Sequence, residues 1–157
     1  MHPLSLPFLH GLRDEALLVL RVVAGGIIGY HGWLHIAGGL DGFGGFIATL
    51  GVPAPTLVAY LVTGLELAGG ILLAVGGLTR VVAVLLALEM IGTTLLVKVD
   101  VGLFAQGGTG AEIDLALLAA FVGLAILGPG LLSVDRAVGI EARQSARAGG
   151  RQPVPAR

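Results

Sequence analysis

The sequence of 157 residues contains no cysteine and few charged residues. Without cysteine, the chain can form no disulfide and cannot bind an iron–sulfur cluster through its own thiolates. Charged residues make up 12% of the chain, where soluble domains average about 25%, and the net charge of −1 gives no reason to expect nucleic acid as a partner. The four histidines (His2, His10, His31 and His35) lie within the first 35 residues, so we expect no haem held by histidines of two helices.

Hydrophobic residues, in contrast, make up 55% of the chain, and the mean hydropathy is +0.96. A soluble fold of this length has too small an interior to bury so much apolar surface, whereas a bilayer allows the exterior to be apolar. Four segments reach the roughly 20 mostly apolar residues that a spanning helix needs: 16–37, 56–76, 80–99 and 113–132. We therefore predict an all-α fold, a four-helix transmembrane bundle.

The spans contain many glycines, which favour close contacts between membrane helices: Gly25, Gly26, Gly64, Gly69, Gly70, Gly92 and Gly123. Between the first two spans, four apolar residues recur at i, i+3, i+4 and i+7: Phe43, Phe46, Ile47 and Leu50. This spacing places them on one helix face. It predicts a short interfacial helix over 41–50, ended by Gly51 and Pro53.

Lysine and arginine are unevenly distributed between the two ends of the predicted bundle. Arg13 precedes the first span, Arg80 lies at the turn between the second and third, and five arginines follow residue 135: Arg136, Arg143, Arg147, Arg151 and Arg157. The other two loops contain neither residue, so the positive-inside rule predicts cytoplasmic N- and C-termini, with Arg80 as a topology anchor. We expect residues 1–135 to form the transmembrane domain and 136–157 a polar, partly disordered cytoplasmic tail.

Three charged residues fall inside the predicted spans, where charge is costly and therefore a functional candidate: Arg21, Glu66 and Glu89. Both carboxylates lie about ten residues from the cytoplasmic end, and we expect Arg21 to reach them and form one intramembrane polar cluster. Two carboxylates sharing one cation cannot both ionise cheaply, which favours a proton-sharing site. The alternative is a structural ion pair that fixes the helix register.

A second polar group is expected near the outer ends of the spans: His31, His35, Lys98, Asp100, Glu112 and Asp114. We predict that these residues line an outer polar mouth. His31 and His35 share a helix face, but no H-E-x-x-H motif accompanies them. Two interfacial histidines hydrogen-bonded to acidic partners are therefore a simpler interpretation than a metal site, and no metal is expected. Glu112 also ends a capping-box pattern over 109–112, so the alternative for it is a purely structural role, as a cap at the start of the fourth span.

Four stretches, in order, resemble the DoxX family of small bacterial membrane proteins: GIIGYHGWLHIAGG, GGFIATLGVPAP, GLELAGGILLAVGGLTR and AEIDLALLAAFVGLAILGPGLLSVD. The third stretch is the most specific, and the resemblance covers about residues 17–135. It implies a four-helix bundle in the bacterial cytoplasmic (inner) membrane. It also marks four positions: His31, Glu66, Arg80 and Asp114.

The family includes the small subunit of a thiosulfate:quinone oxidoreductase and proteins similar to a membrane partner of redox enzymes. The resemblance thus implies an integral membrane subunit or scaffold of a quinone-linked redox complex, without its own redox centre. Its partners would be membrane lipid and other subunits. No cofactor is expected, and a quinone or a lipid is the candidate for a bound molecule.

Two alternatives stay open. One is a small proton-coupled or solute transporter, acting as an oligomer around Glu66, Glu89 and Arg21. The other is a quinone-binding oxidoreductase subunit in which His31, His35 or Lys98 binds the headgroup, so the sequence alone leaves open whether the chain is an enzyme.

Overall fold

A computed structural model describes residues 9, 11–105, 108 and 110–141 of the chain. Regular structure in these residues is helical throughout, without a strand, which confirms the predicted fold class. The elements are α1 (Arg13–Gly38), α2 (Leu40–Thr49), α3 (Pro55–Val75), α4 (Thr79–Thr93) with a π-helical turn (Thr94–Lys98), α5 (Glu112–Leu127) and α6 (Val134–Ala137).

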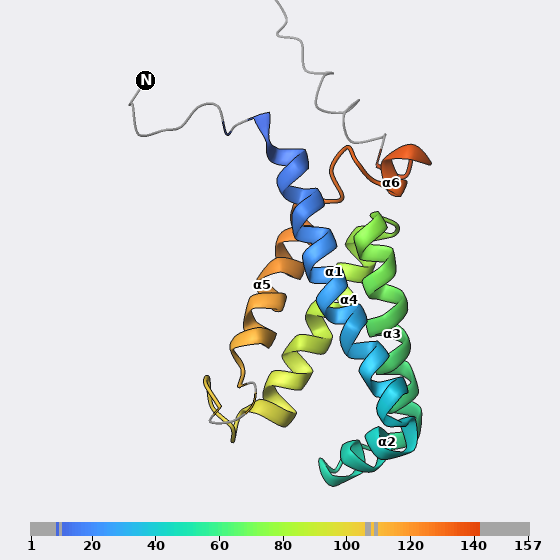
Figure 1. Ribbon diagram of the computed structural model, residues 1–157, viewed down its shortest axis with the longest axis vertical. Helices are drawn as coiled ribbons and strands as arrows, with labels where there is room; N and C mark the ends of the chain where they lie inside the picture. The colour runs from blue at the N-terminus through green and yellow to red at the C-terminus, as the bar shows by residue number, and fades with distance from the viewer. Residues whose placement is uncertain (1–8, 10, 106–107, 109, 142–157) are drawn as a thin grey trace, which may run out of the picture.

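Four helices, α1, α3, α4 and α5, run along the length of the bundle (Figure 1). The short helix α2 lies at one end and α6 at the other, and we call these the α2 end and the α6 end. The start of α1 and the whole of α6 share the α6 end, because the chain passes along the bundle an even number of times.

Three of the helices are long and apolar enough to cross a membrane: α1, α3, and α4 together with its π-helical turn. The helix α5 has only 16 residues, about 24 Å at 1.5 Å per residue, against a hydrocarbon core of roughly 30 Å. It stops where Gly128 and Gly130 take positive φ angles of 82° and 76°. The fourth pass of the bundle is therefore present, while its crossing of the membrane stays a prediction.

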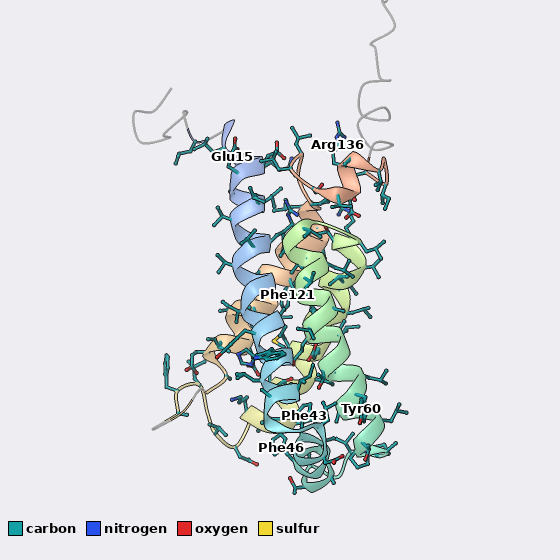
Figure 2. All side chains as sticks on the ribbon, turned by 45° about the vertical axis from the view of Figure 1, so that its right-hand side comes forward. Glu15, Phe43, Phe46, Tyr60, Phe121 and Arg136 are labelled. Carbon is teal, nitrogen blue, oxygen red and sulfur yellow. The ribbon has the colours of Figure 1, made fainter. Side chains whose placement is uncertain are left out.

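The bundle is apolar both inside and outside. Phe121 is fully buried between the helices, whereas Tyr60 is 54% exposed on the outer face (Figure 2). Other large apolar side chains on that outer face are equally open, with Leu61 62% and Ile126 70% exposed. Lipid can cover such a surface at no cost, and water cannot, which supports the bilayer as the solvent of these helices.

Glycines bring α1 and α3 into backbone contact. A Cβ added to Gly70 would lie 2.6 Å from the Gly25 carbonyl oxygen and 2.6 Å from the Gly29 nitrogen. A Cβ on Gly32 would similarly meet the Leu67 nitrogen at 2.6 Å. The predicted role in packing thus holds for Gly25, Gly69 and Gly70, but a Cβ would meet nothing within 4 Å at four other predicted positions: Gly26, Gly64, Gly92 and Gly123.

The interfacial segment forms a helix nearly where the sequence predicts it. The helix α2 begins at Leu40, after Gly39 with a φ of 91°, and ends before Gly51 with a φ of 73°. It packs against α3 and buries Gly44 and Ile47. Its position at the α2 end is compatible with the predicted interfacial location.

Two features of the C-terminal half differ from the sequence analysis. The capping box over 109–112 is wrong, because Glu112 is itself the first residue of α5, where a box would need it two residues further in, and Ala111 provides no side-chain cap. Thr109 lies outside the described residues. The helix α6 straddles the predicted domain boundary at residue 135, and the tail beyond Glu141, with four of its arginines, lies outside the described part.

Candidate functional site

A cavity of about 360 Å³ opens at the α2 end, a volume typical of small-molecule sites. We call it the α2 cavity. Its apolar wall comes from α2, α3, the loop between them and the end of α4, and includes Phe43, Phe46, Ile47, Leu50, Val62 and Leu96. Six ionisable side chains also line it: His31, His35, Glu66, Glu89, Lys98 and Asp114.

Two glutamates form the polar floor of this cavity. Glu66 of α3 and Glu89 of α4 lie at nearly equal distances from the tight turn that joins these antiparallel helices, so their carboxyl groups meet. Neither oxygen of Glu89 accepts a hydrogen bond from a donor in the described part of the chain. Two carboxyl groups can bond to each other only when one of them holds a proton, because two ionised carboxylates have no donor between them.

His35 connects this floor to the aromatic wall. Its Nε2 atom lies 3.1 Å from Oε2 of Glu66. Its ring stacks on Phe43 of α2, with centroids 3.6 Å apart and planes inclined by 11°. One residue thus positions α2 against the carboxyl pair, and Figure 2 shows Phe43 and Phe46 together at this end.

The opposite side of the cavity carries the remaining charges. Asp114, in the first turn of α5, is 5% exposed, and the basic residues Lys98 and His31 are close enough to interact with it electrostatically. The Oδ2 atom of Asp114 has no hydrogen-bond partner among the described residues. Acceptors and donors therefore face the same space, which allows a bound group to contact both kinds.

The structure regroups the predicted site residues. His31, His35, Lys98 and Asp114 of the predicted mouth do line one cavity, but Asp100 and Glu112 do not. Glu66 and Glu89, expected in a separate cluster, are part of the same site. The sequence analysis missed Phe43 and Phe46 as site residues, because their i, i+3 spacing was interpreted as a face turned toward lipid.

Arg21 does not join the two glutamates, so the predicted three-residue cluster is wrong in its cation. The Arg21 guanidinium lies against Gly76, ten residues or about 15 Å of helix from Glu66. Long helical side chains point back toward the N-terminus of their own helix. Arg21 therefore reaches toward the α6 end, where the start of α1 lies, and away from the carboxyl pair.

At the α6 end, Arg21 is fully buried and donates from Nη2 to the Leu132 carbonyl at 2.5 Å. Its charged neighbour is Asp135, which is 2% exposed. Both oxygens of Asp135 accept backbone N–H groups at the start of α4, from Leu78 at 2.7 Å and from Thr79 at 2.8 Å. Asp135 thus caps the start of α4, a role that the sequence analysis did not assign to it, and it lies near Arg21 without an ion pair to it among the described residues.

Arg80 has a structural role in addition to its predicted one as a topology anchor. Its Nη1 atom donates to the carbonyls of Ala125 at 2.6 Å and Ile126 at 2.8 Å, and its Nε donates to Glu141 at 2.9 Å. A cation at these carbonyls stabilises the C-terminus of α5, whose last acceptors have no intrahelical donors.

The fold and this cavity together define a class: multi-pass helical membrane proteins with a carboxyl-lined cavity at one end. The chain belongs to the DoxX family, whose model matches residues 16–99. The matched region contains five of the six ionisable residues that line the α2 cavity, all but Asp114.

Two relatives cover most of the chain. It is 36% identical over 118 residues to a Bacillus subtilis (strain 168) protein named "Putative oxidoreductase CatD", across 75% of this chain and 83% of the relative. It is 31% identical over 133 residues to "Inner membrane protein YphA" of Escherichia coli (strain K12), across 79% of this chain and 91% of the relative. No solved structure matches the chain significantly.

Proposed function

We propose that this protein is an integral subunit of a quinone-linked redox complex in the bacterial inner membrane, and that its α2 cavity binds the quinone headgroup. The single observation that carries the proposal is the α2 cavity itself, which combines an apolar aromatic wall with two neighbouring glutamate carboxyl groups. The names of the two relatives, an oxidoreductase and an inner membrane protein, are consistent with this assignment.

The chemistry of the lining suits a flat ring that carries two oxygens. The stacked rings of His35 and Phe43 offer a surface for the ring. Lys98 and His31 can donate hydrogen bonds to a carbonyl oxygen, and the carboxyl groups can accept them from a hydroxyl. The chain has no cysteine, so electrons would be exchanged with a centre on another subunit. In this proposal its own residues bind the headgroup and move protons.

The first test fills the cavity. Gly92 lines it, and a Cβ there meets nothing within 4 Å, so Gly92→Leu should place its side chain in the cavity without displacing the helices. We expect the wild-type protein, purified gently in detergent, to retain extractable quinone, and Gly92→Leu to lose at least about nine-tenths of it, since one leucine removes much of the space. Chromatography of the extract measures this directly.

The matched control is Gly123→Leu on α5. Gly123 also has open space around its Cβ, but it does not line the cavity. The Gly123→Leu protein should therefore retain as much quinone as the wild type does. Quinone retained in Gly92→Leu, or absent from the wild type, contradicts binding at this place. Mass spectrometry of the same preparation tests the complex, because recovery of a lone homo-oligomer counts against partner subunits.

A second candidate, a proton-coupled transporter, is favoured by one observation, the contact between Glu66 and Glu89 at the cavity floor. In that case Glu66→Gln should abolish proton uptake into liposomes that contain the purified protein, because a glutamine cannot exchange a proton at this pair. A pH-sensitive dye inside the liposomes reports the uptake. Uptake that is equal in the wild type, Glu66→Gln and protein-free liposomes excludes this function.

A further inference from the structure

A second cavity, of about 150 Å³, opens at the α6 end, at the opposite end of the bundle from the α2 cavity. It lies between the start of α1, the segment that follows α5, and the end of the described chain. Three arginines line it, Arg13, Arg80 and Arg136, and apolar side chains such as Leu17 and Leu127 lie beside them. We call it the arginine pocket, and Figure 2 shows Arg136 at this end of the molecule.

The charges of the arginine pocket are not balanced. Its two carboxylates already have partners: Asp14 accepts the Leu131 N–H at 2.9 Å, and Glu141 accepts from Arg80 at 2.9 Å. Within the described part of the chain, the side chains of Arg13 and Arg136 have neither a hydrogen bond nor an ion pair. An anion in the pocket would give these two guanidinium groups the partner that the protein does not provide.

The location of the arginine pocket indicates which kind of anion it binds. It lies where the apolar helices end, and the side chains next to it on the outer surface are apolar, with Leu127 47% and Leu131 58% exposed. Lipid tails cover such a surface, and the headgroups of the same lipids then lie at the level of the arginines. Basic pockets at the ends of membrane helices bind anionic headgroups in this way.

We propose that the arginine pocket binds the phosphate headgroup of an anionic phospholipid, with the lipid tails along Leu127 and Leu131. Guanidinium groups recognise phosphate oxygens through paired hydrogen bonds. A phosphate held between Arg13 and Arg136 would connect the start of α1 to α6, so the bound lipid would stabilise this end of the bundle. The proposal is independent of any ligand in the α2 cavity.

The test measures lipid binding to the full-length protein in detergent by native mass spectrometry. We expect phosphatidylglycerol to bind more tightly than phosphatidylcholine. The double variant Arg13→Gln/Arg136→Gln should weaken phosphatidylglycerol binding about 30-fold, since each basic residue near an anionic lipid contributes about fivefold, and leave phosphatidylcholine binding unchanged. Lys98→Gln is the control for the loss of one positive charge. Because Lys98 lies at the α2 end, this variant should leave phosphatidylglycerol binding unchanged, whatever its effect on a ligand in the α2 cavity.

Three results would overturn the proposal: equal binding of the two lipids to the wild type, an equal loss in Lys98→Gln, or displacement of phosphatidylglycerol by inorganic phosphate at the same concentration. Displacement of that kind would identify free phosphate as the ligand. If the double variant fails to fold, Arg136→Gln alone is measured and should weaken binding about fivefold. An unchanged affinity in that single variant also overturns the proposal.

Discussion

Replacing Asp135 with alanine is expected to destabilise the folded protein by about 3 kcal/mol or more, because two N–H groups lose a charged acceptor at about 1.5–3 kcal/mol each. Two consequences add up at this residue. Arg21, which is 0% exposed, loses its charged neighbour. The N–H groups of Leu78 and Thr79, at the first turn of α4, lose their acceptors as well. Thermal unfolding in detergent, followed by circular dichroism, should show a clearly lowered Tm.

Two variants separate these causes. Asp14→Ala removes a carboxylate at the same end whose hydrogen bond to Leu131 is exposed, and should cost only about 1 kcal/mol. Adding Arg21→Met to Asp135→Ala should recover part of the lost stability, because the unpaired cation is then gone as well. A double variant less stable than Asp135→Ala alone would show that the hydrogen bond from Arg21 to the Leu132 carbonyl stabilises the fold by more than the uncompensated charge costs.

The positions of the helices could be predicted closely from hydropathy and from glycine and proline signals. The predicted spans 16–37, 56–76 and 80–99 match α1, α3, and α4 with its π-helical turn to within three residues at each end. The predicted fourth span, 113–132, extends beyond the C-terminal end of α5. Its residues stay apolar there, but Gly128 and Gly130 take positive φ angles and turn the backbone out of the helix. An apolar composition indicates that a segment lies in lipid, but it does not indicate at which residue the helix ends.

The site was harder to predict, because it depends on the directions of side chains and on how the helices pack, as well as on the depth of each residue along its helix. Glu66 and Glu89 could be paired from their distances to one tight turn, which is a property of the sequence alone. The placement of Arg21 depends on the direction of its long side chain, because that direction decides where along the helix the guanidinium group lies, by several ångströms. The position of Phe43 against His35 depends on how α2 folds back over α1 and α3, which no local pattern encodes.

The bundle should depend more on Gly70 than on any other glycine inside the spans. A Cβ there would lie 2.6 Å from the Gly25 oxygen and 2.7 Å from the Gly29 Cα, and both are backbone atoms that cannot rotate away. Gly70→Val must therefore push α1 away from α3 and open the backbone contact between these two helices. We expect a loss of at least about 3 kcal/mol, the upper range for overpacked cores, and aggregation of much of the protein on extraction.

The matched control lies on the same helix. Gly64 is exposed, and a Cβ there meets nothing within 4 Å, so Gly64→Val introduces the same residue into α3 without a clash. It should extract and elute from size-exclusion chromatography as the wild type does, because intrinsic helix propensity favours valine over glycine. If Gly70→Val also elutes as a single peak with an unchanged Tm, α1 and α3 do not contact through their glycines. If both variants fail, the exposed face of α3 is itself covered by another copy or a partner.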